Sequence, residues 1–175
     1  MKKILPFIIL VIVVIVAVSV FAKIRTASIP PVTNYEECVK GGNIILDSYP
    51  PQCKTSDGKS FTQDIGNELE KKDLITIDNP RPNQRIKSPL TITGKARGTW
   101  FFEASFPVKL LDGNGEVIAE SHVQAQGEWM TEDFVPYEAV LEFETTLKEG
   151  KLILEKDNPS GLPENADQLE IPVKF

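Results

Sequence analysis

Residues 88–115, SPLTITGKARGTWFFEASFPVKLLDGNG, contain the pattern that decides the fold. Apolar and polar side chains alternate from Trp100 to Leu110, as expected of a strand with one buried face. Residues that tolerate positive φ follow at 112–115, and a second alternating run covers residues 117–126. The two runs predict a β-hairpin, and the side chains predicted to point inward from its first strand are Phe102, Ala104, Phe106, Val108 and Leu110.

Other alternating runs predict further strands around this hairpin. They lie at residues 74–78, 90–94, 139–147, 151–155 and 168–175. Seven short strands separated by turn signals within about 100 residues are typical of an immunoglobulin-like fold. We therefore expect an all-β, seven-stranded immunoglobulin-like sandwich over residues 74–175.

The same stretch, followed by DNPSG at 157–161 and a closing IPVKF at 171–175, resembles the immunoglobulin-like domain of bacterial spore germination and sporulation proteins. The resemblance covers about residues 74–175. It implies an accessory or interaction role at the cell envelope. Because the shared residues are strand and turn residues, the resemblance implies a fold and no catalytic residue.

The first 25 residues predict a membrane anchor. Lys2 and Lys3 precede an apolar run at residues 4–22, which is long enough to cross about 30 Å of hydrocarbon as a helix. The alternative is a signal peptide cleaved near Ala22, which would give a secreted protein. In both cases we expect the C-terminal region to be extracytoplasmic, and in the first case the protein is single-pass.

The charge of the region beyond the anchor restricts its partners. Four of the 19 basic residues lie within the first 25 positions, which leaves 15, and all 25 acidic residues come later. The formal charge of this region is therefore 15 minus 25, or −10. Such a balance argues against binding nucleic acid or anionic lipid head groups, because those contacts depend on Lys and Arg.

A small cysteine-containing unit is expected at residues 34–65, between a stalk at 26–33 and a charged linker at 66–73. Thr33 and Glu36 have the spacing of a capping box. They predict a short helix from Asn34 to Lys40, and short strands are predicted at 44–46 and 60–62.

Cys38 and Cys53 are predicted to form a disulfide, because so small a unit has too little apolar area to hold itself together. Closing a loop of about 15 residues would contribute roughly 3 kcal/mol. A redox pair is disfavoured by the spacing, and a zinc site would need more ligands than one histidine supplies. CKTSDGKSF at 53–61 is similar to a stretch of Kazal-type protease inhibitors, so an inhibitory loop is a further alternative.

Two motifs resemble a metal-binding loop and an acid–base residue, but for both a structural or solvated role is the favoured interpretation. Asp112, Asn114 and Glu116 match the start of an EF-hand loop, but Val117 and Val123 stand where that loop requires Gly and Glu. A hairpin turn is the expected role. His122 has no nucleophile near it in the sequence and is expected to be solvated. We predict no metal, cofactor or catalytic site.

Acidic residues near the fifth strand leave a second function open. Glu142 and Glu144 alternate with apolar residues and would share one exposed strand face, and a pair of carboxylates is what a cell-envelope glycan hydrolase uses. Exposed carboxylates on a strand more often form a solvated surface. The expected protein is therefore a non-enzymatic binding module.

The loop GEWMTEDFVPY at 127–137 is the candidate contact surface. It places aromatic and sulfur side chains among acidic residues, outside any clear strand. Such side chains either cap the sandwich core or contact a partner, since aromatics are enriched in interface cores. The partner would be an envelope protein or a cell-wall glycan, and the candidate contact residues are Trp129, Met130, Phe134 and Tyr137.

Overall fold

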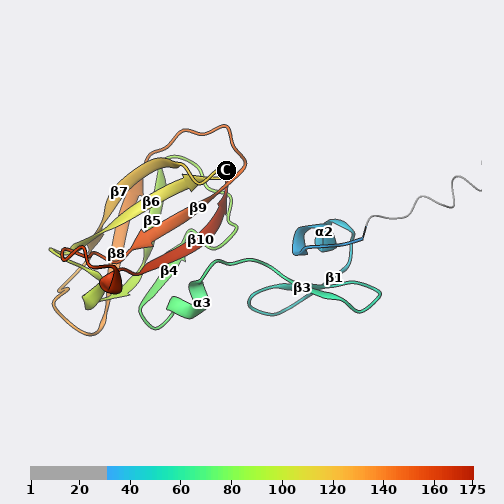
Figure 1. Cartoon of the computed structure of the whole chain (residues 1–175), viewed down its shortest axis with the longest axis horizontal. Coiled ribbons are helices and arrows are strands. Elements are labelled where there is room, and N and C mark those ends of the chain that lie inside the picture. The colour runs from blue at the N-terminus through green and yellow to red at the C-terminus, as the bar shows by residue number, and fades with distance from the viewer. Residues whose placement is uncertain (1–30) are drawn as a thin grey trace, which may run out of the picture. The chain divides into compact units, whose positions relative to one another are not determined.

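The computed structural model describes residues 31–175, which form two compact units (Figure 1). The smaller unit contains residues 31–47 and 52–61, and the larger contains residues 48–51 and 62–175. The anchor predicted at 4–22, with its alternative cleavage site near Ala22, lies outside the described residues. Within residues 31–175, no helix has the length and apolar character needed to cross a bilayer.

A short helix and a three-stranded sheet form the smaller unit. Their bounds are Tyr35–Lys40 for α2, Ile44–Leu46 for β1, Gln52–Lys54 for β2 and Ser60–Thr62 for β3, in the order β1-β2-β3. The predicted helix and the two predicted strands are confirmed. Strand β2 was not predicted, because three residues after two prolines give no alternation to read.

The cap of α2 differs from the predicted one by a residue. Asn34, not Thr33, is the N-cap, and its side-chain oxygen accepts a hydrogen bond from the amide of Glu37 at 2.8 Å. The carboxylate of Glu37 in turn accepts from the amide of Thr33 at 2.8 Å. The predicted capping box is therefore replaced by a cap from Asn34, which caps a helix at least as well as Thr, and Glu37 reaches back to the residue before the cap.

Seven strands and a short helix form the larger unit. Their bounds are Glu68–Lys71 for α3, Ile75–Asn79 for β4, Leu90–Arg97 for β5, Ser105–Asp112 for β6, Val117–Ala125 for β7, Phe134–Leu141 for β8, Glu149–Glu155 for β9 and Gln168–Lys174 for β10. Two 3-10 turns lie at Gly98–Trp100 and Pro163–Asn165. The strand order is β10-β9-β6-β7-β8-β5-β4 (Figure 1).

The sheet folds over at the junction of β7 and β8. Only Gln124 with Glu138 and Ala125 with Tyr137 are paired there, whereas β5 and β8 pair along their whole length. The rings of Phe106 on β6 and Tyr137 on β8 lie 5.2 Å apart, although β7 separates these strands in the sheet order. The two halves therefore pack face to face, and the predicted seven-stranded all-β sandwich is confirmed.

The first hairpin strand is shorter than predicted. It begins at Ser105, so the inward positions Phe106, Val108 and Leu110 are confirmed and fully buried. Phe102 is exposed and Ala104 lies in a turn, because Glu103 and Ala104 have φ angles of 50° and 62°. This left-handed conformation ends a strand, and it is uncommon enough for residues other than glycine that the sequence did not reveal it.

The fifth strand lies earlier than predicted. β8 runs from Phe134 to Leu141, so the strand predicted at 139–147 has the wrong bounds. Every second residue of β8 from Val135 to Leu141 is buried. Phe143 packs beside Phe175 with ring centroids 5.6 Å apart, outside any strand. The acidic residues at 132, 133 and 138 hid the start of this strand in the sequence, because they are the exposed half of the pattern or lie just before it.

Residues 66–73, expected to be a linker, are part of the larger unit. Asn67 holds this segment against β10. Its side-chain oxygen accepts from the amide of Glu170 at 2.7 Å, and its side-chain nitrogen donates to the carbonyl of Gln168 at 3.0 Å. The sequence could not reveal the contact, because a polar segment has no apolar period and its partner strand lies 103 positions later.

Candidate functional site

The candidate contact loop lies at one end of the sandwich. β5, β7 and β9 end there, and β6, β8 and β10 begin there, so their connections meet at this end. The amide of Ala125 donates a hydrogen bond to the carbonyl of Ala104 at 2.8 Å. The amide of Asp157 donates to the carbonyl of Trp100 at 3.0 Å. Three connections far apart in the sequence are thereby joined: residues 98–104, 126–133 and 156–167.

Gly98 lets the backbone of the contact loop pack directly on the connection between β5 and β6. A side chain at Gly98 would place its Cβ 1.9 Å from the carbonyl oxygen of Thr131 and 2.3 Å from that of Trp129. The amide of Gly98 also donates to the carbonyl of Asp133 at 3.2 Å. The backbone of the loop is therefore held close against Gly98.

Arg97 attaches the contact loop to the sandwich at a second point. Its guanidinium lies over the ring of Phe134 at 4.2 Å, and Nη1 donates to the carbonyl of Glu132 at 3.1 Å. Its Nε donates to the carbonyl of Asp73 at 3.1 Å. Phe134 is half-buried under this cation, so it offers only part of its ring to a partner.

The four candidate contact residues divide into three groups. Met130 is the most exposed, with 74% of its surface accessible. Trp129 and Phe134 are half-buried, and Trp129 packs against the core. Tyr137 is 1% exposed and lies inside the sandwich, so it has no surface left for a partner.

Acidic side chains surround Met130. Glu128, Glu132 and Asp133 are all exposed, and the carboxylate of Glu128 accepts a hydrogen bond from the amide of Met130 at 3.0 Å. An exposed thioether side chain adapts to irregular apolar surfaces. Together these residues form a small apolar contact with an acidic rim, which is complementary to an apolar surface flanked by basic groups.

A polar cavity of about 700 Å3 lies beside this end of the sandwich. It is lined by α3, by the ends of β9 and β10 and by Pro107. Two charged pairs involve residues of its wall: Lys71 lies 2.5 Å from Asp167, and Glu155 lies 2.8 Å from Lys109. Sequence reasoning did not bring these groups together, because α3 was interpreted as linker.

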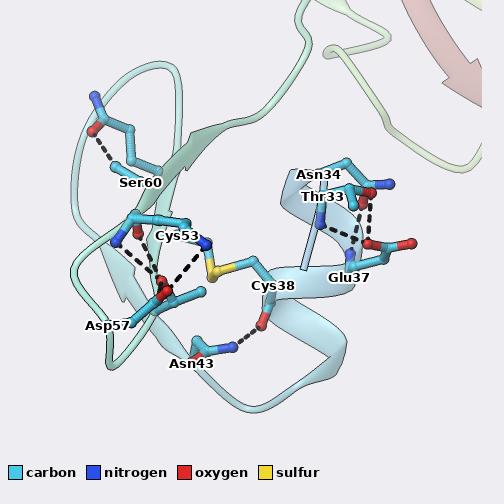
Figure 2. Close-up of a disulfide and its surroundings, with 11 residues drawn as sticks. Thr33, Asn34, Glu37, Cys38, Asn43, Cys53, Asp57 and Ser60 are labelled. Atoms are coloured by element: carbon cyan, nitrogen blue, oxygen red, sulfur yellow. Dashed lines mark hydrogen bonds and ion pairs between the residues drawn. A yellow bond between two sulfur atoms is a disulfide. The ribbon is translucent and has the colours of Figure 1, made fainter. Parts of the chain in front are cut away.

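The predicted disulfide is confirmed. Cys38 on α2 and Cys53 on β2 are joined with a Cα–Cα distance of 6.0 Å, and both are fully buried (Figure 2). The side chain of Asn43 donates to the carbonyl of Cys38 at 2.9 Å. The disulfide therefore holds the helix on the sheet.

Two carboxylates of the smaller unit are stabilised in their charged form. Hydrogen bonds from the amide and hydroxyl of Thr33 lower the pKa of Glu37. A hydrogen bond from the hydroxyl of Thr55, with Lys59 at 3.1 Å, lowers the pKa of Asp57. Both groups are exposed. Glu37 lies in the first turn of α2, and Asp57 lies in the turn between β2 and β3, within the Kazal-like stretch 53–61 (Figure 2).

The remaining sequence candidates are placed in turns or on exposed surface. The carboxylate of Asp112 accepts from the amides of Asn114 at 2.8 Å and Glu116 at 3.0 Å, as in a hairpin turn. His122 is exposed on β7. Glu142 and Glu144 are exposed but lie beyond the end of β8, so they share no strand face. Within residues 31–175, no group of three or more His, Cys, Asp or Glu side chains is arranged to hold a metal ion.

A buried carboxylate that the sequence did not indicate lies at the start of α3. Glu68 pairs with Arg81 at 2.7 Å and accepts a hydrogen bond from the hydroxyl of Tyr49. Arg81 also donates to the oxygen of Tyr49 at 2.8 Å. Burial, together with the bond to Glu68, raises the pKa of Tyr49 to about 12.

One comparison with known proteins gives a match. A family model described as the immunoglobulin-like domain of bacterial spore germination matches residues 74–161, about half of the chain. The matched segment runs from the residue before β4 through β9 to the end of DNPSG. The resemblance seen in the sequence is thereby confirmed. No curated protein and no solved structure matches the chain.

Proposed function

Because the chain belongs to the family of the immunoglobulin-like domain of bacterial spore germination, we propose that it is a germination-related accessory protein that binds a partner at the cell envelope and catalyses no reaction. The match over residues 74–161 is the observation that carries this proposal. A family defined by strand and turn residues supports a binding scaffold, because function on such a fold resides in its loops.

The proposed location is the outer face of the membrane. Residues 4–22 anchor the chain, and the C-terminal region is extracytoplasmic. The disulfide supports this location, because such bonds persist in oxidising compartments. The formal charge of −10 beyond position 25 supports a partner that is neither nucleic acid nor an anionic head group.

The proposed contact surface is the loop at 127–133 with Met130 at its centre. An envelope protein or a wall glycan would meet Met130 first, with Trp129 and Phe134 beside it. The backbone contacts at Gly98 support this role, because a fixed loop loses little entropy on binding.

Photocrosslinking from the full-length chain in the native cell tests the proposal. A photoreactive amino acid replaces Met130 in one variant and Val117 in the control. Val117 is 51% exposed and lies at the opposite end of β7 from the contact loop. We expect a crosslinked partner from position 130 and none from position 117. The same partner at equal yield from both positions would contradict the proposed surface.

A second measurement separates binding from hydrolysis. The double variant E142Q/E144Q removes the two carboxylates that the hydrolase alternative would use, and both are exposed, so the fold is expected to persist. We expect the crosslink from position 130 and the germination response to be unchanged. Loss of the germination response with a retained crosslink would favour an envelope glycan hydrolase.

A further inference from the structure

Strand β1 exposes three consecutive apolar side chains. Ile44, Ile45 and Leu46 are 69%, 54% and 39% exposed. Of the residues the structure describes, these three form the longest run of exposed large apolar side chains. Side chains this apolar are rarely left in water together unless something covers them.

The side chains of β1 are exposed on both of its faces, and its outer edge is unpaired within residues 31–175. Ile45 is paired with Cys53, so these two side chains share a face, and Ile44 and Leu46 point to the other. The disulfide of Cys53 attaches α2 on the first face, yet Ile45 stays exposed beside it. Because β1 is at the edge of the order β1-β2-β3, its outer side has no neighbouring strand within residues 31–175.

The sequence places this strand close to the proposed anchor. Only residues 23–34 separate the apolar run at 4–22 from the first residue of α2. Even fully extended, such a stretch spans at most about 40 Å. The smaller unit is therefore held near the bilayer surface at all times, which raises its effective concentration there.

The charge of the smaller unit permits such a contact. Residues 31–61 carry three basic and four acidic side chains, so their formal charge is 3 minus 4, or −1. The acidic residues that argue against anionic head groups lie mainly beyond this unit. Apolar burial, which needs no Lys or Arg, is then the attractive interaction.

We propose that β1 is a membrane-contact strand: Ile44, Ile45 and Leu46 rest in the interfacial region of the bilayer that holds the anchor. This inference rests on the anchoring proposed above. The interfacial region still contains water, so the open edge of β1 keeps hydrogen-bonding partners there that the hydrocarbon core could not supply. The disulfide fixes β2 to α2, and β1 is hydrogen-bonded to β2, so the three side chains are presented together.

The full-length chain in nanodiscs of phosphatidylethanolamine and phosphatidylglycerol, brominated near the top of the acyl chains, tests this inference. The variant I45W places a fluorescent reporter on β1. The matched control is S60W, which places the reporter on β3 at the opposite edge of the same sheet (Figure 2). The wild-type signal from Trp100 and Trp129 is subtracted, and an intact disulfide in both variants shows that the unit is folded.

We expect the brominated lipids to quench the added fluorescence of I45W several-fold more than that of S60W. Replacing Ile44 by Ser in the I45W background is expected to weaken the quenching. Equal quenching of I45W and S60W in discs that retain the chain would overturn the contact and leave the anchor standing. Chain that is not retained in the discs would overturn the anchor, and this inference with it.

A second copy of the chain is the competing occupant. Discs loaded with one or with two chains separate the two possibilities. Protection of I45W from a water-soluble quencher in one-chain discs supports the lipid surface. Protection that appears only in two-chain discs would overturn it in favour of a β1 contact between copies.

Discussion

The hydroxyl of Tyr137 donates a hydrogen bond to the carbonyl oxygen of Thr76 at 2.9 Å and thereby crosses an entire strand. Tyr137 lies on β8 and Thr76 on β4, and β5 separates these strands in the sheet. Gly94 on β5 makes this possible, since a Cβ there would lie 2.4 Å from the Tyr137 oxygen and 2.2 Å from that of Thr76. Burial raises the pKa of Tyr137, so it remains a neutral donor.

The variant Y137F is expected to destabilise the sandwich by about 1–3 kcal/mol, because the carbonyl of Thr76 loses its side-chain partner in a part-buried site. Urea unfolding followed by Trp fluorescence measures the change, since Trp100 and Trp129 both lie in the sandwich. The control is Y35F in the smaller unit, which is expected to leave this transition in place. An unchanged midpoint for Y137F would show that the bond contributes nothing net.

The variant G94A is expected to destabilise the sandwich by about 1–3 kcal/mol through overpacking, because its methyl group has no room between Tyr137 and Thr76. The control is G127A, where a Cβ would meet no atom within 4 Å. Thermal unfolding of both variants measures the difference. Equal melting temperatures would mean that the strands move apart at little cost.

The double variant C38S/C53S is expected to lower the free energy of unfolding of the smaller unit by roughly 3 kcal/mol, which leaves that unit largely unfolded. The larger unit has its own core and is expected to stay folded. Hydrogen exchange followed by mass spectrometry reads the two units separately. Loss of protection in β5 and β8 as well would contradict the independence of the two units.

Alkaline pH is expected to weaken the contact between Tyr49 and Glu68. The pKa of Tyr49 is raised from 10 to about 12, so its stabilising effect is fully present below pH 10 and is lost as the pH rises through 12. Because Tyr49 is half exposed, the effect is about 1 kcal/mol after solvent screening.

The variant Y49F, compared with wild type in urea over this pH interval, checks the prediction. The stability difference between the two proteins is expected to shrink toward pH 12, because a phenylalanine has no proton to lose. A difference that stays constant over the interval would mean that Tyr49 titrates as it does in the unfolded chain.

Local patterns predicted much of the fold. The alternation around Phe106 predicted a buried strand, because period two is a property of neighbouring residues. The spacing and small size of the cysteine unit predicted its disulfide. The start of the hairpin strand was wrong, since positive φ at Glu103 and Ala104 leaves no trace in residue type. The bounds of the fifth strand were wrong because flanking acidic residues obscured its alternation.

In the candidate contact loop, some features follow from the sequence and others only from the tertiary structure. By itself the sequence determined that aromatic and acidic side chains gather at 127–137, and that the surrounding strands form an immunoglobulin-like sandwich. Only the tertiary structure decided that Tyr137 is a core residue and Met130 a surface one. That difference depends on β8 pairing with β5 and on the space above Gly94, and such long-range pairing has no counterpart in the local order of residues.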